Sequence, residues 1–194
     1  PKVLIPVFPG TNCEYDMAAA FNRYGGEAEI FVIRNLSAKN MEDSVNEFAK
    51  RIEGSQMIAV PGGFSGGDEP EGSAKFINAF FRNPKIKDAV ENMLYARDGL
   101  MIGICNGFQA LIKLGLVPFG KIVPLSSESP TLTYNTIGRH QSQLALTKIC
   151  TSKSPWLMHC KVGEVYNIPI SHGEGRFVAS DEVIAKLIEN GQIA

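Results

Sequence analysis

Short apolar runs alternate with helix-length amphipathic segments through the first two thirds of this 194-residue chain. The apolar runs occupy residues 2–8, 27–33, 56–60 and 100–104. The segments predicted as helices occupy residues 13–24, 40–52, 74–81, 85–97 and 106–114. Strand–helix–strand repeats of this kind require a parallel sheet with right-handed crossovers. The chain is therefore predicted to be an α/β protein whose parallel sheet lies between two layers of helices.

The last third of the chain has a different pattern. Residues 144–150 and 162–170 are predicted strands, and residues 181–190 are a predicted short helix. Residues 124–130 form a loop rich in serine and proline, and the sequence contains no internal repeat, low-complexity tract or clear interdomain linker. A single domain over residues 1–194 is expected, because this length suits one domain with a substantial core.

Composition and charge exclude several classes of function. The formal net charge is −1 and the basic residues are scattered, so the chain has neither a nucleic-acid-binding stripe nor a membrane-binding tail. No apolar run approaches the ~20 residues that span a bilayer, and no export signal is expected, because residues 2–8 read as a strand. Reduced thiols in a cytoplasmic protein are therefore expected at the four widely spaced cysteines, Cys13, Cys105, Cys150 and Cys160.

No metal or cofactor is expected in this chain. The histidines and cysteines lack the spacing of metal ligands. The acidic residues Asp68, Glu69 and Glu71 suit a solvated loop better than a metal site, because their spacing matches no known ligand pattern.

One cysteine stands in a sequence context that indicates catalysis. Cys105 follows the apolar run 100–104 directly and is flanked by Gly103 and Gly107. Small flanking residues permit the sharp strand-to-helix turn of a nucleophile elbow. The partial positive charge at the N-terminus of the following helix stabilises a thiolate. Although most free cysteines are inert core residues, this context predicts that Cys105 is the nucleophile of an acyl transfer from an amide or ester.

A glycine-rich loop follows the third predicted strand. Residues 61–68 read Pro-Gly-Gly-Phe-Ser-Gly-Gly-Asp. Because the carboxyl ends of parallel strands share one edge of a sheet, this loop and Cys105 are expected to lie at the same edge. A backbone N–H of the loop, together with that of Asn106, would stabilise the oxyanion of a tetrahedral intermediate. A flexible surface loop is the alternative interpretation.

A third polar segment, residues 171–176, reads Ser-His-Gly-Glu-Gly-Arg after a predicted strand. A thiol nucleophile is usually partnered by a histidine, which a carboxylate or amide orients. From the residues alone, His172 is the candidate base and Glu174 the candidate orienting group. The alternative interpretation is a polar loop in which Glu174 pairs with Arg176 or with a partner surface. The residues support the two interpretations about equally.

Together these segments resemble the class I glutamine amidotransferase domain of phosphoribosylformylglycinamidine synthase. The matching stretches are Phe-Pro-Gly-Thr-Asn-Cys-Glu at 8–14, the glycine loop at 61–68, Gly-Ile-Cys-Asn-Gly-Phe-Gln at 103–109 and His-Gly-Glu-Gly-Arg-Phe at 172–177. They occur in the order found in that family and span nearly the whole chain. The resemblance implies a flavodoxin-like three-layer α/β/α sandwich with a mainly parallel central sheet.

The resemblance also implies an activity and a set of roles. The expected reaction is hydrolysis of L-glutamine to glutamate and ammonia. A separate synthetase domain or subunit would use this ammonia, with ATP and Mg²⁺, to convert formylglycinamide ribonucleotide to its amidine in purine synthesis. Cys105 would form the glutamyl thioester. The N–H groups of Gly63 and Asn106 would hold the oxyanion, and Gly62 and Gln109 would contact the glutamine substrate.

One departure from the family pattern affects the catalytic base. In that family the histidine and glutamate of the triad lie in a His-Pro-Glu segment nearer the C-terminus, and this chain contains none. Since the chain runs only from Pro1 to Ala194, it is expected to be an incomplete piece of the large fused enzyme. His172 and Glu174 would then line the edge of the site or contact the synthetase. The isolated fragment is expected to be a poor glutaminase.

Two alternatives remain open at this point. The first is another cysteine enzyme or chaperone on a similar fold, such as the DJ-1/PfpI group. Members of that group typically carry a histidine directly after the elbow cysteine, where this chain has Asn106. The second is a noncatalytic domain that docks on a synthetase without turning over glutamine.

Overall fold

The computed structural model describes residues 1–66 and 74–194. The chain divides into two compact units, Pro1–Pro124 and Leu125–Ala194. Their boundary falls in the loop rich in serine and proline. The expectation of one domain over residues 1–194 stays a prediction. The predicted acidic loop with Asp68, Glu69 and Glu71 lies outside the described residues.

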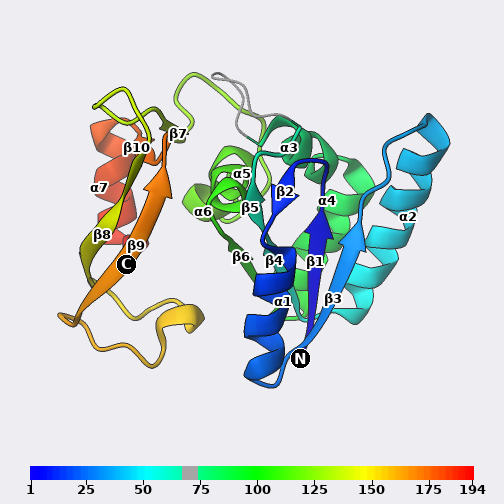
Figure 1. Ribbon diagram of the computed structural model, residues 1–194, viewed down its shortest axis with the longest axis horizontal. Coiled ribbons are helices and arrows are strands. Elements are labelled where there is room, and N and C mark those ends of the chain that lie inside the picture. The colour runs from blue at the N-terminus through cyan, green and yellow to red at the C-terminus, as the bar shows by residue number, and fades with distance from the viewer. Residues whose placement is uncertain (67–73) are drawn as a thin grey trace. The chain divides into compact units, whose positions relative to one another are not determined.

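The first unit is built on a four-stranded parallel sheet with the strand order β3-β1-β4-β6 (Figure 1). Its strands are β1 (Lys2–Val7), β3 (Glu27–Val32), β4 (Met57–Val60) and β6 (Leu100–Gly103). Each corresponds to one of the four predicted apolar runs. The prediction of an α/β protein with a parallel central sheet is therefore confirmed.

Helices follow each strand of this sheet, as predicted. They are α1 (Glu14–Arg23), α2 (Ala38–Gly54), α3 (Lys75–Phe81), α4 (Pro84–Glu91), the π-helix η1 (Asn92–Ala96), α5 (Asn106–Leu114) and α6 (Leu116–Phe119). Capping side chains fix two of the starts: Ser37 accepts a hydrogen bond from the Asn40 N–H of α2, and Asn83 accepts one from the Lys85 N–H of α4. The helix predicted over 85–97 is divided, since its last turn widens into η1.

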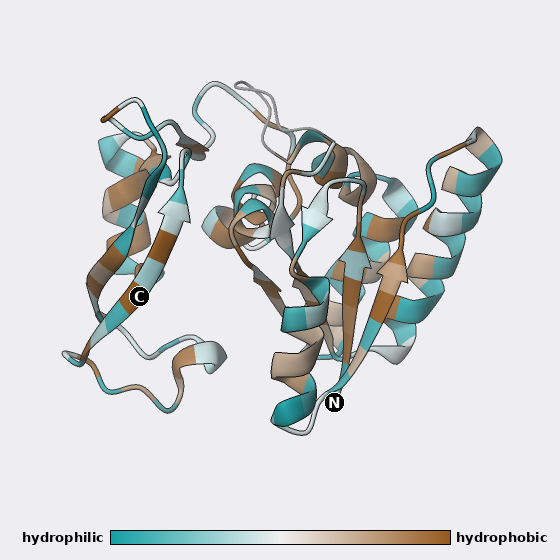
Figure 2. Cartoon of the chain, in the orientation of Figure 1, coloured by the Kyte–Doolittle hydropathy of each residue, from teal (hydrophilic) through white to brown (hydrophobic). Residues whose placement is uncertain are grey.

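Alternate residues of the strands face two separate apolar layers. Val3 and Ile5 of β1 pack with Ala18 of α1 on one face of the sheet. Leu4 of β1 packs on the other face with residues of α2, α3, α4 and α5, among them Phe48. Figure 2 shows that these strands are predominantly hydrophobic, which is the pattern of strands covered on both faces. The first unit therefore has the layered α/β/α arrangement that the sequence predicted.

The second unit is formed mainly by antiparallel strands and one helix. Strand β8 (Gln141–Lys148) pairs with β9 (Val165–His172), and the short β7 (Thr131–Thr133) pairs with β10 (Arg176–Val178). The remaining elements are the 3-10 helix η2 (Pro155–Leu157) and α7 (Asp181–Glu189). The predicted strands and helix of this region are confirmed, with their starts and ends shifted by a few residues. The β7–β10 pair was not predicted.

The structure contains no candidate for a membrane-crossing element among its described helices. None of these helices is both long enough and apolar enough to span a bilayer.

Candidate functional site

Cys105 lies at the turn between β6 and α5, in a backbone conformation that side-chain-bearing residues rarely adopt. Its φ is 52° and its ψ is −107°, and it is the N-cap residue of α5. Such a conformation costs on the order of 1–3 kcal/mol and persists only where the surrounding structure enforces it. The side chain is exposed and the thiol is free. Cys105 therefore has the backbone and the accessibility that a nucleophile elbow requires.

The two glycines beside Cys105 allow this turn by very close backbone contact. A Cβ on Gly103 would lie 2.5 Å from the carbonyl carbon of Gly107. A Cβ on Gly107 would lie 2.2 Å from the carbonyl oxygen of Val60, at the end of β4. Neither position has room for any side chain, so the Gly-x-Cys-x-Gly pattern is a steric requirement of this turn.

The glycine loop lies directly against Cys105. A Cβ on Gly62 would stand 3.2 Å from the Cβ of Cys105 and 4.0 Å from its Sγ. The expectation that the loop and Cys105 share one edge of the sheet is therefore confirmed. Gly63 has a φ of 109°, which favours glycine, and a Cβ there would meet the backbone of Thr11 at 2.8 Å.

A two-residue ladder joins this loop to the turn after β1. Strand β2 (Thr11–Asn12) pairs antiparallel with β5 (Gly62–Gly63), with Thr11 opposite Gly63 and Asn12 opposite Gly62. The N–H of Phe64 also donates to the carbonyl of Gly10 at 2.7 Å. The segments 8–14 and 61–66 thus form one connected structure beside Cys105. The sequence did not predict this ladder, because two-residue strands carry no periodic pattern.

Buried amides lie at the start of α5, directly after the cysteine. The side chains of Asn106 and Gln109 are 0% and 9% exposed. The Nδ2 of Asn106 donates to the Oε1 of Gln109 at 3.0 Å, and the Oγ of Ser65 donates to the Oδ1 of Asn106 at 2.7 Å. Within the first unit, the structure therefore gathers Gly62, Gly63, Cys105, Asn106 and Gln109 at one edge of the sheet. Their chemical roles stay predictions.

The second unit holds the other candidate residues, His172 and Glu174. The Nδ1 of His172 lies 2.9 Å from the Oδ1 of Asn135, a side chain that is 8% exposed. The same Oδ1 accepts from the Gly175 N–H at 3.4 Å, while the Nδ2 of Asn135 donates to the His172 carbonyl at 2.8 Å. With the amide oriented in this way, Nδ1 of His172 is the donor and Nε2 is the nitrogen that can accept a proton.

Asn135 is a partner of His172 that the sequence did not single out. It is 37 positions from His172 and stands in no recognisable motif. In the structure this amide hydrogen-bonds the His172 ring, and the suggestion that Glu174 orients the ring stays a prediction. Beside it, the Nε2 of His140 lies 2.9 Å from the Oγ of Ser171. The role of His172 and Glu174 in any reaction stays a prediction.

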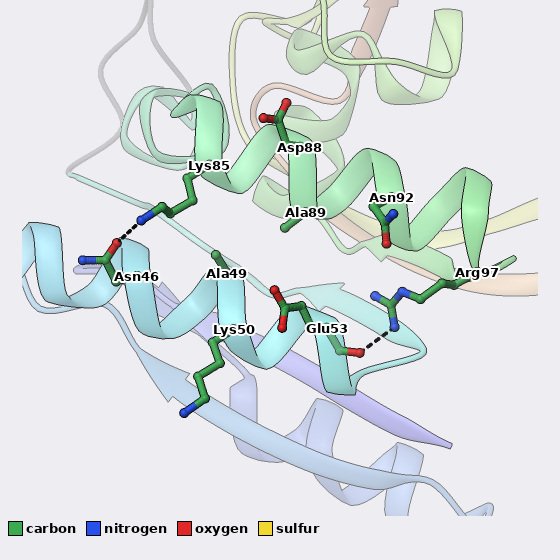
Figure 3. Close-up of a pocket in the computed structure, with 9 residues that line it drawn as sticks. All are labelled: Asn46, Ala49, Lys50, Glu53, Lys85, Asp88, Ala89, Asn92 and Arg97. Carbon is green, nitrogen blue, oxygen red and sulfur yellow. Dashed lines mark hydrogen bonds between the residues drawn. The ribbon is translucent and has the colours of Figure 1, made fainter.

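Two hollows in the first unit lie away from these residues. A groove of about 710 Å³ runs between α2 and α4 (Figure 3). In it the Lys85 amine donates to the Asn46 amide oxygen, and Arg97 donates to backbone carbonyls at the C-terminal end of α2, including that of Glu53. A second hollow of about 350 Å³ lies where β1 and β3 end. None of the predicted site residues lines either hollow.

The structure describes the side chains of residues 1–66 and 74–194. These ranges contain no group of three or more histidine, cysteine, aspartate or glutamate residues arranged to hold an ion.

Comparison with known proteins gives consistent matches over the whole chain. Residues 1–194 match the family of CobB/CobQ-like glutamine amidotransferase domains. The chain is 34% identical, over 187 residues, to the PurQ subunit of phosphoribosylformylglycinamidine synthase from Dehalococcoides mccartyi. That match covers 96% of this chain and 66% of the relative. The same subunit from Symbiobacterium thermophilum is 31% identical over 189 residues, which are 97% of this chain and 68% of the relative. The chain thus spans about two thirds of the length of these relatives.

Two solved structures have a similar fold. The PurLQS structure from Thermotoga maritima matches with a TM-score of 0.66 and 27% identity, covering 94% of this chain and 71% of the matched chain. The glutaminase domain of a Trypanosoma brucei protein named CTPS, solved with bound acivicin, matches with a TM-score of 0.54 and 14% identity. It covers 95% of this chain and 71% of that one, and the likeness concerns the fold alone.

Proposed function

Because this chain belongs to the family of CobB/CobQ-like glutamine amidotransferase domains, we propose that it hydrolyses L-glutamine and delivers the ammonia to a synthetase. The observation that carries the proposal is the exposed Cys105, held at φ 52° at the N-terminus of α5 with the glycine loop against it. The PurQ relatives support phosphoribosylformylglycinamidine synthase as the enzyme concerned. Such an enzyme acts in purine synthesis, which would place the chain in the cytoplasm.

The proposed reaction begins with attack of the Cys105 thiolate on the side-chain carbonyl carbon of glutamine. The carbon–sulfur bond forms and the carbonyl oxygen becomes an oxyanion. The N–H groups of Gly63 and Asn106 stabilise that charge, because donors fixed in advance lose no free energy to reorganisation during the reaction. Cleavage of the carbon–nitrogen bond then releases ammonia, after the nitrogen gains a proton, and leaves a glutamyl thioester on Cys105.

A water molecule completes the cycle. It attacks the thioester carbon, loses a proton, and releases glutamate with the free thiol. The proton transfers of both steps need a general base, and no residue of this chain is assigned that role. In the resembled family, the histidine of the His-Pro-Glu segment supplies this base.

The roles of the partner and of the remaining residues complete the proposal. Gly62 and Gln109 contact the glutamine substrate. The synthetase uses the ammonia together with ATP and Mg²⁺ to form the amidine of formylglycinamide ribonucleotide, and no cofactor is assigned to this chain.

The test is glutaminase turnover of the chain assembled with its synthetase partner. Cys105→Ser should lower kcat at least about 10³-fold, because the nucleophile is lost. The matched control is Cys150→Ser, which changes an exposed thiol of the second unit and should leave turnover unchanged. Labelling with the glutamine analogue diazo-oxo-norleucine, followed by peptide mass spectrometry, should modify Cys105.

The same measurements separate the alternatives. Retention of glutamine turnover by Cys105→Ser would contradict the proposed nucleophile. An assembled wild-type enzyme that binds the synthetase without forming a thioester would indicate a noncatalytic docking domain. A Cys105 that reacts with other acyl donors but not with glutamine or its analogue would favour the DJ-1/PfpI group.

A further inference from the structure

A chain of buried hydrogen bonds links the glycine loop to the residue that follows Cys105. The Oγ of Ser65 donates to the Oδ1 of Asn106 at 2.7 Å, and the N–H of Ser65 points to the same oxygen at 3.3 Å. The Nδ2 of Asn106 then donates to the Oε1 of Gln109 at 3.0 Å. Ser65 is 2% exposed and Asn106 is 0% exposed. Water is therefore excluded from these hydrogen bonds. Because no water can replace a lost partner, the positions of Ser65 and Asn106 relative to each other are closely constrained.

The glycine loop is held in place by hydrogen bonds rather than by side-chain packing. Gly62 and Gly63 have no side chains with which to pack, and Gly63 is in the left-handed region at φ 109°. On one side the loop is tied to the turn after β1, where the N–H of Phe64 donates to Gly10 and the N–H of Gly66 donates to Pro9 at 2.8 Å. On the other side, the Ser65–Asn106 hydrogen bonds tie the loop to the start of α5.

The two ends of the link adjoin the two proposed oxyanion donors. Ser65 stands two residues after Gly63, which is one proposed donor. Asn106 is the other proposed donor through its backbone N–H, and its side-chain oxygen accepts the hydrogen bond from Ser65. A change in the Ser65–Asn106 distance would therefore change the separation of the two donors. Donors must stand about 2.7–3.1 Å from the oxyanion, and misplacement by about 1 Å can lower a rate about 10²-fold.

We propose that Ser65 is a positioning residue for this site, which sets the spacing of the oxyanion donors by hydrogen-bonding Asn106. This inference rests on the proposed glutaminase function and adds a role that the elbow motif does not contain. Ser65 acts through Asn106 and Gly63 and takes no part in bond making. Its hydroxyl matters in the transition state, when charge develops on the substrate oxygen, and little when glutamine first binds.

The test compares Ser65→Ala with Ser44→Ala in the chain assembled with its synthetase. Ser44 is a matched control, because it is 1% exposed and its Oγ accepts from the Arg34 N–H at 3.0 Å, outside the contacts around Cys105. Ser65→Ala should lower kcat about 10–100-fold with little change in KM. Ser44→Ala should leave both constants near those of the wild type.

A second readout separates positioning from a general loss of structure. Iodoacetamide alkylates a thiolate without forming an oxyanion, so its rate at Cys105 should stay within about twofold of the wild type in Ser65→Ala. The rate is followed on the peptide that contains Cys105, because Cys13 and Cys150 are also exposed. Equal losses of kcat and of alkylation rate would overturn the proposal, and so would an unchanged kcat.

A near-isosteric variant keeps the proposal testable if Ser65→Ala fails to fold. Ser65→Cys replaces the hydroxyl with a weaker donor of similar shape, and it should also lower kcat while alkylation at Cys105 continues. Full activity of Ser65→Cys would count against the hydrogen bond. A wild-type complex with no glutaminase activity would refute the proposed function itself, whereas an active wild type with a fully active Ser65→Ala would refute this inference alone.

Discussion

The backbone fixes the geometry around Cys105, whereas a buried amide fixes the geometry around His172. At Cys105, Gly103, Gly107 and Gly62 approach neighbouring atoms so closely that a Cβ would stand 2.2–3.2 Å away. At His172, four hydrogen bonds converge on the side chain of Asn135. Main-chain contact tolerates almost no change, while a side-chain network can lose one member and relax. The two regions should therefore respond differently to small substitutions.

The largest effect is expected for Gly107→Ala. The new Cβ would lie 2.2 Å from the carbonyl oxygen of Val60, which belongs to the central sheet and cannot move aside cheaply. We expect the free energy of unfolding to fall by at least about 3 kcal/mol, as measured by urea denaturation. The control is Gly54→Ala at the end of α2, where nothing lies within 4 Å of the new Cβ. A stable Gly107→Ala protein with full turnover would show that the backbone is not the constraint.

An intermediate effect is expected for Asn135→Ala in the second unit. The substitution removes the amide that hydrogen-bonds to three groups: the His172 ring, the His172 carbonyl and the Arg139 carbonyl. Loss of several partly buried hydrogen bonds should lower the stability of this unit by about 2–3 kcal/mol. Hydrogen exchange of its amides measures this loss, and the imidazole nitrogen resonances should show that His172 no longer favours Nδ1–H. Asn167→Ala, at an exposed position of β9, should change neither measurement.

The smallest effect is expected for Gly175→Ala, compared with Gly173→Ala. A Cβ at position 175 would lie 2.3 Å from the Nδ1 of His172, whereas at position 173 nothing lies within 4 Å. Because the imidazole can rotate away, we expect a cost of only about 1 kcal/mol together with loss of the bond to Asn135. Chemical denaturation measures the loss of stability, and the imidazole nitrogen resonances of His172 report the loss of the bond to Asn135. Equal behaviour of the two variants would argue against a fixed ring.

Much of the first unit could be predicted from local patterns. The four strands of the parallel sheet follow from continuous apolar runs, and α5 spans Asn106–Leu114 as the sequence indicated. The elbow could also be recognised, because its glycines are neighbours of Cys105 in sequence. The β2–β5 ladder could not, since each strand has two residues and the pairing joins segments about 50 positions apart.

The second unit shows where sequence reasoning reaches its limit. The motif around His172 is recognisable in the sequence, and Glu174 is the nearest carboxylate along the chain that could orient its ring. The structure adds Asn135, from a turn beyond β7, as a hydrogen-bond partner of the ring. Any polar side chain can orient an imidazole if the fold brings it within about 3 Å. Separation along the chain therefore hides such a partner.

The sequence by itself determined the α/β class, the segments that form the strands of the parallel sheet and the position of Cys105 at a strand-to-helix turn. These features depend on the spacing of apolar residues and on glycines within two positions of the cysteine. Only the tertiary structure decided that Gly62 lies against Cys105, that Ser65 binds Asn106 and that Asn135 orients His172. These contacts join residues about 40 positions apart, and a buried hydrogen bond leaves no periodic signal in either segment.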